Sequence, residues 1–340
     1  MRIAALEASS PDAVFSFLDA SVSPRGRDHW RWKYQLERSA EARAFYHLGS
    51  DGSVDGFIGL MPTRLCTQQS SVRAAWFVDW ATVPGERSVG AGVGLLRHAQ
   101  AQTEMLLTLQ GSADTQKILP KLRWTEARTP STWILRLSAR AIADRGPVRR
   151  RPWLLAPALL AAGIARLRYR VGRPAEVAFR LREIDRFPAS YDATWEERRQ
   201  EFVPLMERTS AQLNFMCADY PGGGYSRFLV LEEERVAGHL ILRCDSTGGL
   251  ARGRIVDALW TRERPGMTDW LVSQACWLLQ QRAVDFIDCT VSALDFERAL
   301  RGRRFSRRAG VPIWYHRLPA GVPTPDQWFI TYLDCDRAYR

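Results

Sequence analysis

The same short patterns occur twice along this chain, at a nearly constant spacing. Three pairs of landmarks carry the repetition, with offsets of 178, 179 and 181 residues: Phe77–Trp80 with Ile255–Ala258, Gly59 with Gly238, and Trp124 with Phe305. A fixed spacing of this kind indicates an internal duplication. It favours folds in which two halves have the same order of helices and strands.

Hydrophobic periodicity and turn residues predict the elements of each half. In the first half we expect helices at 12–20, 90–103 and 113–122 and strands at 44–48, 57–65, 76–83, 105–110 and 133–137. In the second half we expect helices at 192–208, 267–282 and 293–301 and strands at 227–231, 236–244, 253–260, 284–290 and 312–318. This order predicts a mixed α/β (α+β) fold, with 133–137 and 312–318 as the closing strands of their own halves.

The charge distribution separates the two halves. Eight arginines and no acidic residue lie between Arg145 and Ala175, and the net charge of +11 falls to +3 without them. Because the basicity is local, nucleic acid is not expected as a partner. We therefore predict a first domain at 1–138, a basic linker at 139–180 and a second domain at 181–340.

The linker also contains an apolar run of thirteen residues, Trp153 to Ala165, interrupted by Pro157. This run is too short for a transmembrane helix, which needs about 20 residues. We favour a linker helix packed between the domains. The alternative is an interfacial helix within 145–173, in which apolar side chains enter a bilayer and arginines bind anionic headgroups, so that the protein contacts a membrane peripherally.

Residues 76–97 have the order of a strand, a loop and a helix that opens on glycines. Phe77–Val83 has the aromatic and β-branched content of a strand, and Pro84-Gly85 ends it. Gly90-Ala91-Gly92 then allows backbone amides to approach an anion at the start of a helix. The stretch therefore predicts a phosphate-binding loop.

Other glycine loops fit less well. A dinucleotide-binding fingerprint needs G-x-G-x-x-G at the strand end, whereas six residues intervene here and the glycines are Gly90, Gly92 and Gly94. A Walker loop needs Gly-Lys-Ser/Thr, and the three lysines of the chain lie elsewhere. A flexible turn before an ordinary helix remains the simple alternative.

Arg87-x-x-Gly90-x-Gly92 resembles the acyl-CoA pyrophosphate loop of the GCN5-related N-acetyltransferase (GNAT) superfamily. The whole chain is similar to bacterial tandem-GNAT proteins associated with exopolysaccharide or other surface-glycan biosynthesis. The segments that carry this resemblance are His29–Tyr34, Gly59–Arg64, Asp79–Gly94, Gly111–Trp124 and Trp328–Asp336. It implies two GNAT-like domains in tandem, with acyl-CoA between a splayed fourth and fifth strand.

The resemblance implies acetyl-CoA or another acyl-CoA as co-substrate. A backbone N–H near Thr82 or Val83 would polarise the thioester carbonyl. The further cofactor contacts that it implies are Arg87, Ser88, Val89, Gly90, Ala91, Gly92, Val93 and Ser112.

Asp79 is the implied catalytic base, because many superfamily members carry an acidic residue near the acceptor at this strand. The equal alternative is a carboxylate that fixes strand geometry or binds substrate. The family's acid is often a tyrosine after the fifth strand, but Ser112–Trp124 contains none. The acid is therefore not identified, and the thiolate could leave unassisted.

The second half keeps only Gly266 in the corresponding loop, so we predict one CoA per chain. The cluster of His29, Trp30, Lys33 and Tyr34 could line an acceptor site; the alternative is a helix that packs its rings on the core. Asp334 and Asp336 in the tail are expected to be solvated.

Cysteines and histidines lack ligand spacing, so neither a metal site nor a disulfide framework is expected. The first residues do not resemble a signal peptide, which predicts a cytoplasmic protein, with the inner membrane face as an alternative.

Three functions follow. The first is an acyl-CoA-dependent N- or O-acyltransferase that acetylates an amino sugar or another small amine in surface-polysaccharide biosynthesis. The second is a non-catalytic acyl-CoA-binding or scaffold protein. The third is a peptidoglycan transferase that uses aminoacyl-tRNA.

Overall fold

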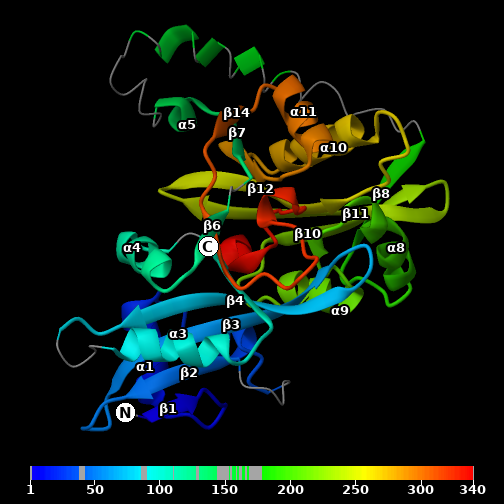
Figure 1. Cartoon of the computed structure of the whole chain (residues 1–340). Helices are drawn as coiled ribbons and strands as arrows, with labels where there is room; N and C mark the ends of the chain where they lie inside the picture. The colour runs from blue at the N-terminus through cyan, green and yellow to red at the C-terminus, as the bar shows by residue number, and fades with distance from the viewer. Residues whose placement is uncertain are drawn as a thin grey trace.

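The structure is a computed structural model with two mixed β-sheets, one in each lobe of the molecule (Figure 1). It describes residues 2–37, 43–85, 90–109, 111–127, 130–143 and 178–339, together with nine positions between 153 and 167. Two mixed sheets flanked by helices confirm the predicted fold class.

The first sheet has the strand order β1-β2-β3-β4-β5-β15-β6, and β9 adds to the far end of β3. Its strands are β1 (Arg2–Ala5), β2 (Ala44–Leu48), β3 (Val54–Cys66), β4 (Ser71–Thr82), β5 (Met105–Leu109), β6 (Thr125–Ala127), β9 (Leu205–Met206) and β15 (Ile313–His316). Among the described strands of this sheet, only β4 and β5 are parallel neighbours.

Helices cover both faces of this sheet. They are α1 (Asp12–Ser21), α2 (Arg27–Lys33), α3 (Ala91–Gln100) and α4 (Ala113–Lys121). Side chains alternate along β4. Val78 packs with Trp30 of α2 in one buried cluster, while Phe77 packs with Leu95 of α3 in another. One face is therefore covered by α1 and α2, and the opposite face by α3 and α4.

The second sheet has the order β14-β7-β13-β12-β11-β10-β8. Its strands are β7 (Thr132–Arg136), β8 (Phe179–Ile184), β10 (Tyr225–Glu232), β11 (Arg235–Thr247), β12 (Leu250–Leu259), β13 (Phe286–Thr290) and β14 (Ser306–Arg308). The helices of this lobe are α5 (Ala139–Ala143), α8 (Tyr191–Arg198), α9 (Ser210–Leu213), α10 (Met267–Gln281) and α11 (Leu294–Gly302).

Each sheet contains one strand from the other half of the chain. β7 pairs with β13 and β14, whereas β15 pairs with β5 and β6. The prediction that 133–137 and 312–318 close their own halves was therefore wrong. Periodicity identifies both as strands, but a strand can satisfy its backbone hydrogen bonds equally well in either sheet. The two halves are consequently joined at two sheets as well as through the chain.

The predicted helix at 192–208 is also wrong beyond its first half. The α-helix ends at Arg198, a 3-10 turn follows at Arg199–Glu201, and β9 begins at Leu205. Pro204 has no backbone N–H and disfavours helical geometry at Val203, so the helix cannot continue. The other predicted helices and strands are confirmed, with ends that differ by a few residues.

The C-terminal tail lies between the two lobes, drawn red at the centre of Figure 1. It includes the 3-10 turns η5 (Pro325–Gln327) and η6 (Cys335–Tyr339). Tyr225 Oη donates a hydrogen bond to the carbonyl of Ala338 at 2.8 Å, and Arg254 Nη1 donates to that of Arg337 at 2.9 Å. The tail is thus held as a buried part of the core shared by both lobes.

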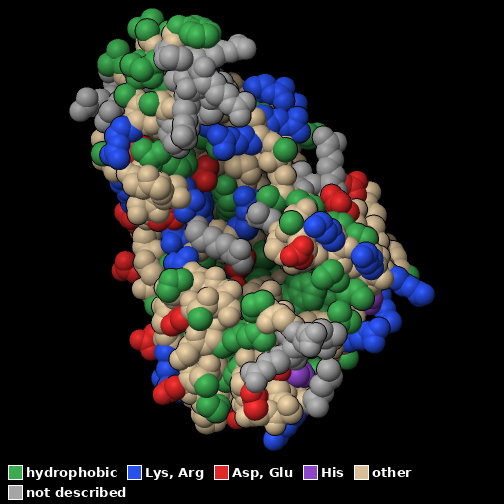
Figure 2. Space-filling view, turned by 90° about the vertical axis from the view of Figure 1, so that its left-hand side faces the viewer, with side chains coloured by type: hydrophobic (Ala, Val, Ile, Leu, Met, Phe, Trp, Pro, Cys, Tyr) green, Lys and Arg blue, Asp and Glu red, His purple; other side chains and the backbone are tan. Residues whose placement is uncertain are grey.

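The large hydrophobic side chains in the middle of the linker include four that are exposed, whereas Ala141 and Ile142 of α5 at its start are buried. Trp153, Leu160, Ile164 and Leu167 have exposed fractions of 71%, 68%, 52% and 61%. The interpretation of a helix packed between the domains is wrong for these residues. Figure 2 shows hydrophobic side chains gathered at the upper end of the molecule, where Figure 1 places this segment. Among the described residues, no helix has the length and apolar character needed to cross a bilayer.

Candidate functional site

The first sheet opens between β4 and β5. These strands pair in parallel only from Ala74–Trp76 to Met105–Leu107, yet β4 continues to Thr82 and β5 to Leu109. The strands therefore diverge beyond Trp76 and leave a gap. This gap is where the sequence resemblance places acyl-CoA.

A β-bulge lies in β4 beside this gap. Gly59 pairs with Val78 and Phe57 with Ala81, so Asp79 and Trp80 together oppose a single residue of β3. Asp79 has a φ of 54°, a left-handed conformation that is uncommon outside glycine. A bulge bends a strand and redirects a side chain.

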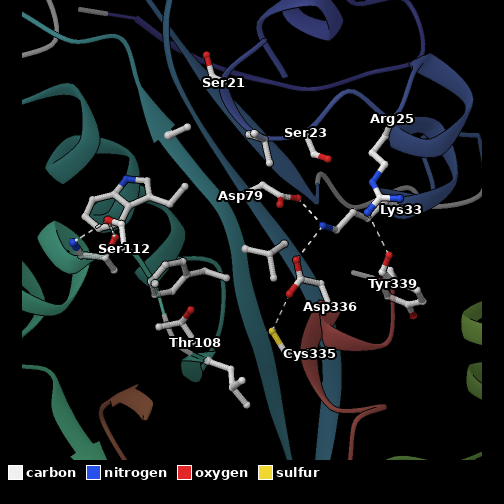
Figure 3. A pocket seen from close by; sticks show the side chains of 18 of the residues that line it. Ser21, Ser23, Arg25, Lys33, Asp79, Thr108, Ser112, Cys335, Asp336 and Tyr339 are labelled. Carbon is white, nitrogen blue, oxygen red and sulfur yellow. Dashed lines mark hydrogen bonds and ion pairs between the residues drawn. The ribbon is translucent and has the colours of Figure 1, made fainter. Parts of the chain in front are cut away.

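A pocket of about 610 Å³ occupies the gap and reaches both faces of the sheet. Phe77 and Trp80 line it from the α3 face, whereas Trp30 and Tyr339 line it from the opposite face. In Figure 3, Ser112 lies across the pocket from Lys33, Asp79 and Asp336. Two molecules that enter from opposite faces could therefore meet inside the sheet.

Asp79 belongs to a buried ion-pair cluster on the α2 side of the pocket. Lys33 Nζ lies 2.5 Å from Asp79 Oδ2 and 3.2 Å from Asp336 Oδ2 (Figure 3). Tyr34 Oη donates to the same Asp79 oxygen at 2.5 Å. A Cβ at Gly59 would overlap the Tyr34 ring, which explains the glycine there. The cluster unites three of the predicted residues with a fourth from the tail.

The tail carboxylates are not solvated, which corrects the prediction for Asp334 and Asp336. Their exposed fractions are 2% and 4%. Arg208 Nη2 lies 2.8 Å from Asp334 Oδ2, and burial raises the pKa of this carboxyl. Ion pairing explains the burial, because a carboxylate leaves water only when its charge is compensated.

His29, which the sequence suggests for an acceptor site, lines the same pocket. Its side chain is buried against aromatic rings, including those of Trp32 and Tyr220. Burial, together with the charges of Lys33 and Arg25, lowers the pKa of His29 to about 4. The imidazole is therefore neutral at pH 7. Among the described residues, no group forms a hydrogen bond with its ring nitrogens.

Trp30 also lines the pocket, although its indole is committed to the fold. Its Nε1 donates to Asp19 Oδ1 at 2.8 Å. The lining residues that the sequence interpretation did not assign to the site include Arg25, Cys335, Asp336 and Tyr339. The aromatic and apolar run at Trp328–Leu333 was a usable signal, since a run of this kind predicts a buried segment.

The start of α3 has the geometry of an anion site. Gly90 is the N-cap residue with a φ of 83°, and no side chain caps the helix. Gly92 packs closely, since a Cβ there would lie 3.2 Å from Thr82 Cγ2, and Trp80 Nε1 donates to the Gly92 carbonyl at 3.1 Å. The first amides of α3 are thus held beside β4.

The remaining predicted cofactor contacts differ in their placement. Ala91 is buried and Val93 half-buried in α3. Ser112 lines the pocket and caps α4, since its Oγ accepts from the Thr115 amide at 3.1 Å. Arg87, Ser88 and Val89 lie outside the described residues.

Thr82 and Val83 have amides that face different sides. The Val83 N–H donates to the Asp55 carbonyl at 2.9 Å, toward β3. This contact corrects the suggestion that Val83 polarises a carbonyl in the gap. Since amides alternate along a strand, the Thr82 N–H faces away from β3, on the side where β5 has diverged.

The corresponding gap in the second sheet is filled. β12 and β13 pair from Arg252–Ile255 to Phe286–Cys289, and beyond them only about 10 Å³ remains among side chains that include Trp260, Phe296 and Phe329. The tail thus supplies packing where the first sheet has a pocket.

Asp257 lies beside this filled gap in its own buried network. Its Oδ2 lies 2.9 Å from Arg208 Nε and 2.9 Å from His239 Nε2, and its Oδ1 accepts from Thr331 Oγ1 at 2.6 Å. Burial alone would raise the pKa of Asp257, but Arg208 and these hydrogen bonds lower it. The network borders the small space of about 10 Å³ that remains in this gap, which is too small for a substrate and favours a structural role.

Comparison with solved structures shows the fold. The chain is similar to a GCN5-related N-acetyltransferase from Anabaena variabilis ATCC 29413, with a TM-score of 0.62 and 12% sequence identity over 92% of this chain and 72% of that one. It is also similar to a conserved protein of unknown function from Enterococcus faecalis V583, described as a probable N-acyltransferase, with a TM-score of 0.60 and 9% identity over 92% and 71%. No protein-family model and no curated protein matches the sequence. The chain therefore has a GNAT-like fold.

Proposed function

We propose that this chain is an acyl-CoA-dependent acyltransferase that transfers an acetyl group to the nitrogen or oxygen of a small acceptor. The observation that carries the proposal is the pocket through the first sheet. It reaches from Trp80, whose indole N–H donates to the Gly92 carbonyl at the start of α3, to the ionisable cluster on the other face of the sheet. This topology suits direct acyl transfer, because it lets donor and acceptor enter from different faces and meet at one carbonyl carbon.

The reaction is a direct displacement. The acceptor amine attacks the thioester carbonyl, a C–N bond forms, the C–S bond breaks, and CoA leaves as its thiolate. Amides at the start of α3 would bind the pyrophosphate, and the outward amide of Thr82 would stabilise the developing oxyanion. The acceptor's proton must pass to a group on the α2 side.

His29 is the better candidate for this proton than Asp79. Sequence resemblance favours Asp79, but its Oδ2 already accepts from Lys33 and Tyr34. His29 lines the pocket and is unprotonated at pH 7, so it can accept a proton, although its pKa of about 4 makes it a weak base. We therefore assign His29 as the base and Asp79 as the residue that positions Lys33 beside the acceptor.

The choice of an amino sugar, and of surface-polysaccharide biosynthesis as the pathway, rests on the sequence resemblance. The pocket adds that the acceptor meets both cationic and anionic side chains, since Arg25, Asp79 and Asp336 all line it. A small polar molecule with an amine suits this lining better than an apolar one.

The test is release of the CoA thiol from acetyl-CoA in the presence of a panel of amino sugars and other small amines. We expect acceptor-dependent release, and a loss of about 100-fold or more in kcat for His29→Gln. His98→Gln, on α3, is the matched control and should retain activity. Binding of acetyl-CoA without thiol release for any acceptor would favour a scaffold protein, and salt-sensitive tRNA binding would favour the aminoacyl-tRNA alternative.

A further inference from the structure

Arg25 places a positive charge at the mouth of the pocket that contains the buried cluster of Lys33, Asp79 and Asp336. It lies in the loop 22–26 between α1 and α2 and lines the pocket, but it is exposed, whereas the members of the cluster are buried. We propose that Arg25 selects acceptors that carry an acid group, a carboxylate or a phosphate, in addition to the amine. This inference rests on the proposed acyltransferase function and names its class of acceptor.

The charge of Arg25 is not compensated within the part of the chain that the structure describes. No carboxylate of a described residue lies within ion-pair distance of its guanidinium, and its Nη2 donates a long hydrogen bond of 3.4 Å to the Tyr339 carbonyl. The neighbouring Arg27, in contrast, forms an ion pair with Asp12. A guanidinium has five N–H donors, so Arg25 retains donors for an anionic ligand.

The backbone around Arg25 is held in place. Asp19 Oδ1 accepts hydrogen bonds from the amides of Arg25 at 3.1 Å and Gly26 at 3.0 Å, and from Trp30 Nε1 at 2.8 Å. Gly26, with a φ of 79°, then leads into α2. A side chain on a fixed backbone loses less conformational entropy on binding than one on a mobile loop. The loop therefore presents Arg25 at one place beside the pocket.

One short turn of the tail brings both kinds of charge within reach of one small molecule. Lys33 Nζ contacts the Asp336 carboxylate at 3.2 Å near the start of η6, and Arg25 contacts the Tyr339 carbonyl at its end. The three residue steps from Asp336 to Tyr339 correspond to about 6 Å along a 3-10 turn. A metabolite with an amine at one end and an acid group at the other suits this separation.

The cluster inside the pocket has a formal charge opposite to that of Arg25. Lys33 contributes one ammonium, and Asp79 and Asp336 contribute two carboxylates, which leaves a net charge of −1. A protonated acceptor amine is attracted to this cluster, while an acid group on the same molecule is attracted to Arg25. An amine without an acid group gains only the first interaction. Charge complementarity therefore favours zwitterionic acceptors over purely cationic ones.

The phosphates of CoA do not account for Arg25. The loop of Arg25 joins α1 and α2, which cover one face of the first sheet, whereas the glycine-rich start of α3 lies on the opposite face. In Figure 3, Arg25 lies on the side of Lys33 and Asp336, across the pocket from Ser112. Since the pyrophosphate is expected at α3, an anion at Arg25 belongs to the second molecule, the acceptor.

The experiment is thiol release from acetyl-CoA by the full chain with two matched pairs of acceptors. Glucosamine-6-phosphate is compared with glucosamine, and γ-aminobutyrate with γ-aminobutyramide, so that the members of each pair differ in the acid group. We expect kcat/KM to be at least about tenfold higher for the acidic member of one pair, as for a hydrogen bond between charged groups. The pair that shows this preference distinguishes phosphate from carboxylate as the group bound.

Arg25→Gln should lower this ratio toward one, mainly by raising KM for the acidic acceptor, and Arg25→Lys should keep part of it because the charge remains. Arg27→Gln is the matched control, because Arg27 pairs with Asp12 and does not line the pocket, so it should keep the wild-type ratio.

Two results would overturn the inference and leave the acyltransferase function intact. They are thiol release with equal kcat/KM within both pairs, and a preference for the acidic member that Arg25→Gln leaves unchanged. Absence of thiol release with every acceptor would instead count against the acyltransferase function, and the inference would fall with it.

Discussion

Asp336, four residues before the end of the chain, forms a buried ion pair with Lys33 in the second helix, with 3.2 Å between Oδ2 and Nζ. Lys33 also contacts Asp79 on the bulge of β4. The pocket that we propose for acyl transfer is therefore completed by residues from α2, β4 and the C-terminal tail. Several of its properties can be tested separately.

Lys33→Met should strongly destabilise the protein. Removal of the ammonium leaves Asp79 and Asp336 as buried carboxylates without this partner, and breaking a buried pair in this way costs about 3–5 kcal/mol. Urea unfolding measures the change. Lys117→Met is the control, since Lys117 and its partner Asp114 are exposed, and its effect should stay below about 1 kcal/mol. A change for Lys33→Met as small as that of the control would contradict the structural role of the cluster.

Gly92→Glu should abolish acyl-CoA binding. The new side chain would meet Thr82 and Trp80 and place a negative charge beside the predicted pyrophosphate site. Gly94→Glu adds the same charge two residues later, where a Cβ has no neighbour within 4 Å. Calorimetric titration with acetyl-CoA should show binding for Gly94→Glu and none for Gly92→Glu. Equal affinities would mean that the start of α3 does not hold the cofactor.

The chain should bind one acyl-CoA. The gap in the second sheet retains about 10 Å³, because Trp260, Phe296 and Phe329 fill it. Calorimetry of the wild type should give a stoichiometry of one, and two equivalent sites would refute the prediction.

Phe329→Ala tests the same packing by another route. The truncation should lower the free energy of unfolding by about 3–5 kcal/mol, as expected for a buried phenylalanine. Leu294→Ala, at an exposed position, should change it little. A Phe329→Ala variant with the free energy of unfolding of the wild type would show that this side chain does not stabilise the second lobe.

The stability of the protein should depend on His29 below neutral pH. The pKa of His29 is about 4 in the folded chain and near its ordinary value of 6.5 in the unfolded chain. Between these values the unfolded state binds a proton that the folded state does not, so stability falls as pH falls from 6.5 toward 4. The His29→Gln variant has no imidazole at this position and therefore lacks this pH-dependent loss of stability. Urea midpoints at pH 7 and pH 4.5 should therefore fall further in the wild type than in the variant, and parallel losses would disprove the assignment.

Residues 1–138 should not fold alone. In that fragment β5 and β6 lose β15, the strand that joins them, and β7 has no partner strand. Circular dichroism and gel filtration should show an unfolded or aggregated fragment, while the full chain is monodisperse. A well-folded fragment with one acetyl-CoA site would show that the strand exchange is dispensable.

Local sequence patterns predicted most elements because they report local interactions. The aromatic and β-branched content of Phe77–Val83 predicted β4, and the glycines after it predicted the start of α3. The sequence also predicted the position of Asp79 beside the gap, since this position depends only on where one strand lies and where it ends. The sequence did not predict the left-handed bulge at Asp79, because a register shift also involves the neighbouring strand β3.

The sequence by itself determined the mixed α/β fold, the order of elements in each half and the glycine-rich helix start, since each of these depends on residues close together in the chain. Only the tertiary structure decided the exchange of β7 and β15, the filled second gap and the pairing of Asp336 with Lys33. These features join residues that lie far apart in the sequence. Their partners are chosen by which arrangement buries the apolar surface and compensates the charges of the whole chain, and no local pattern records that choice.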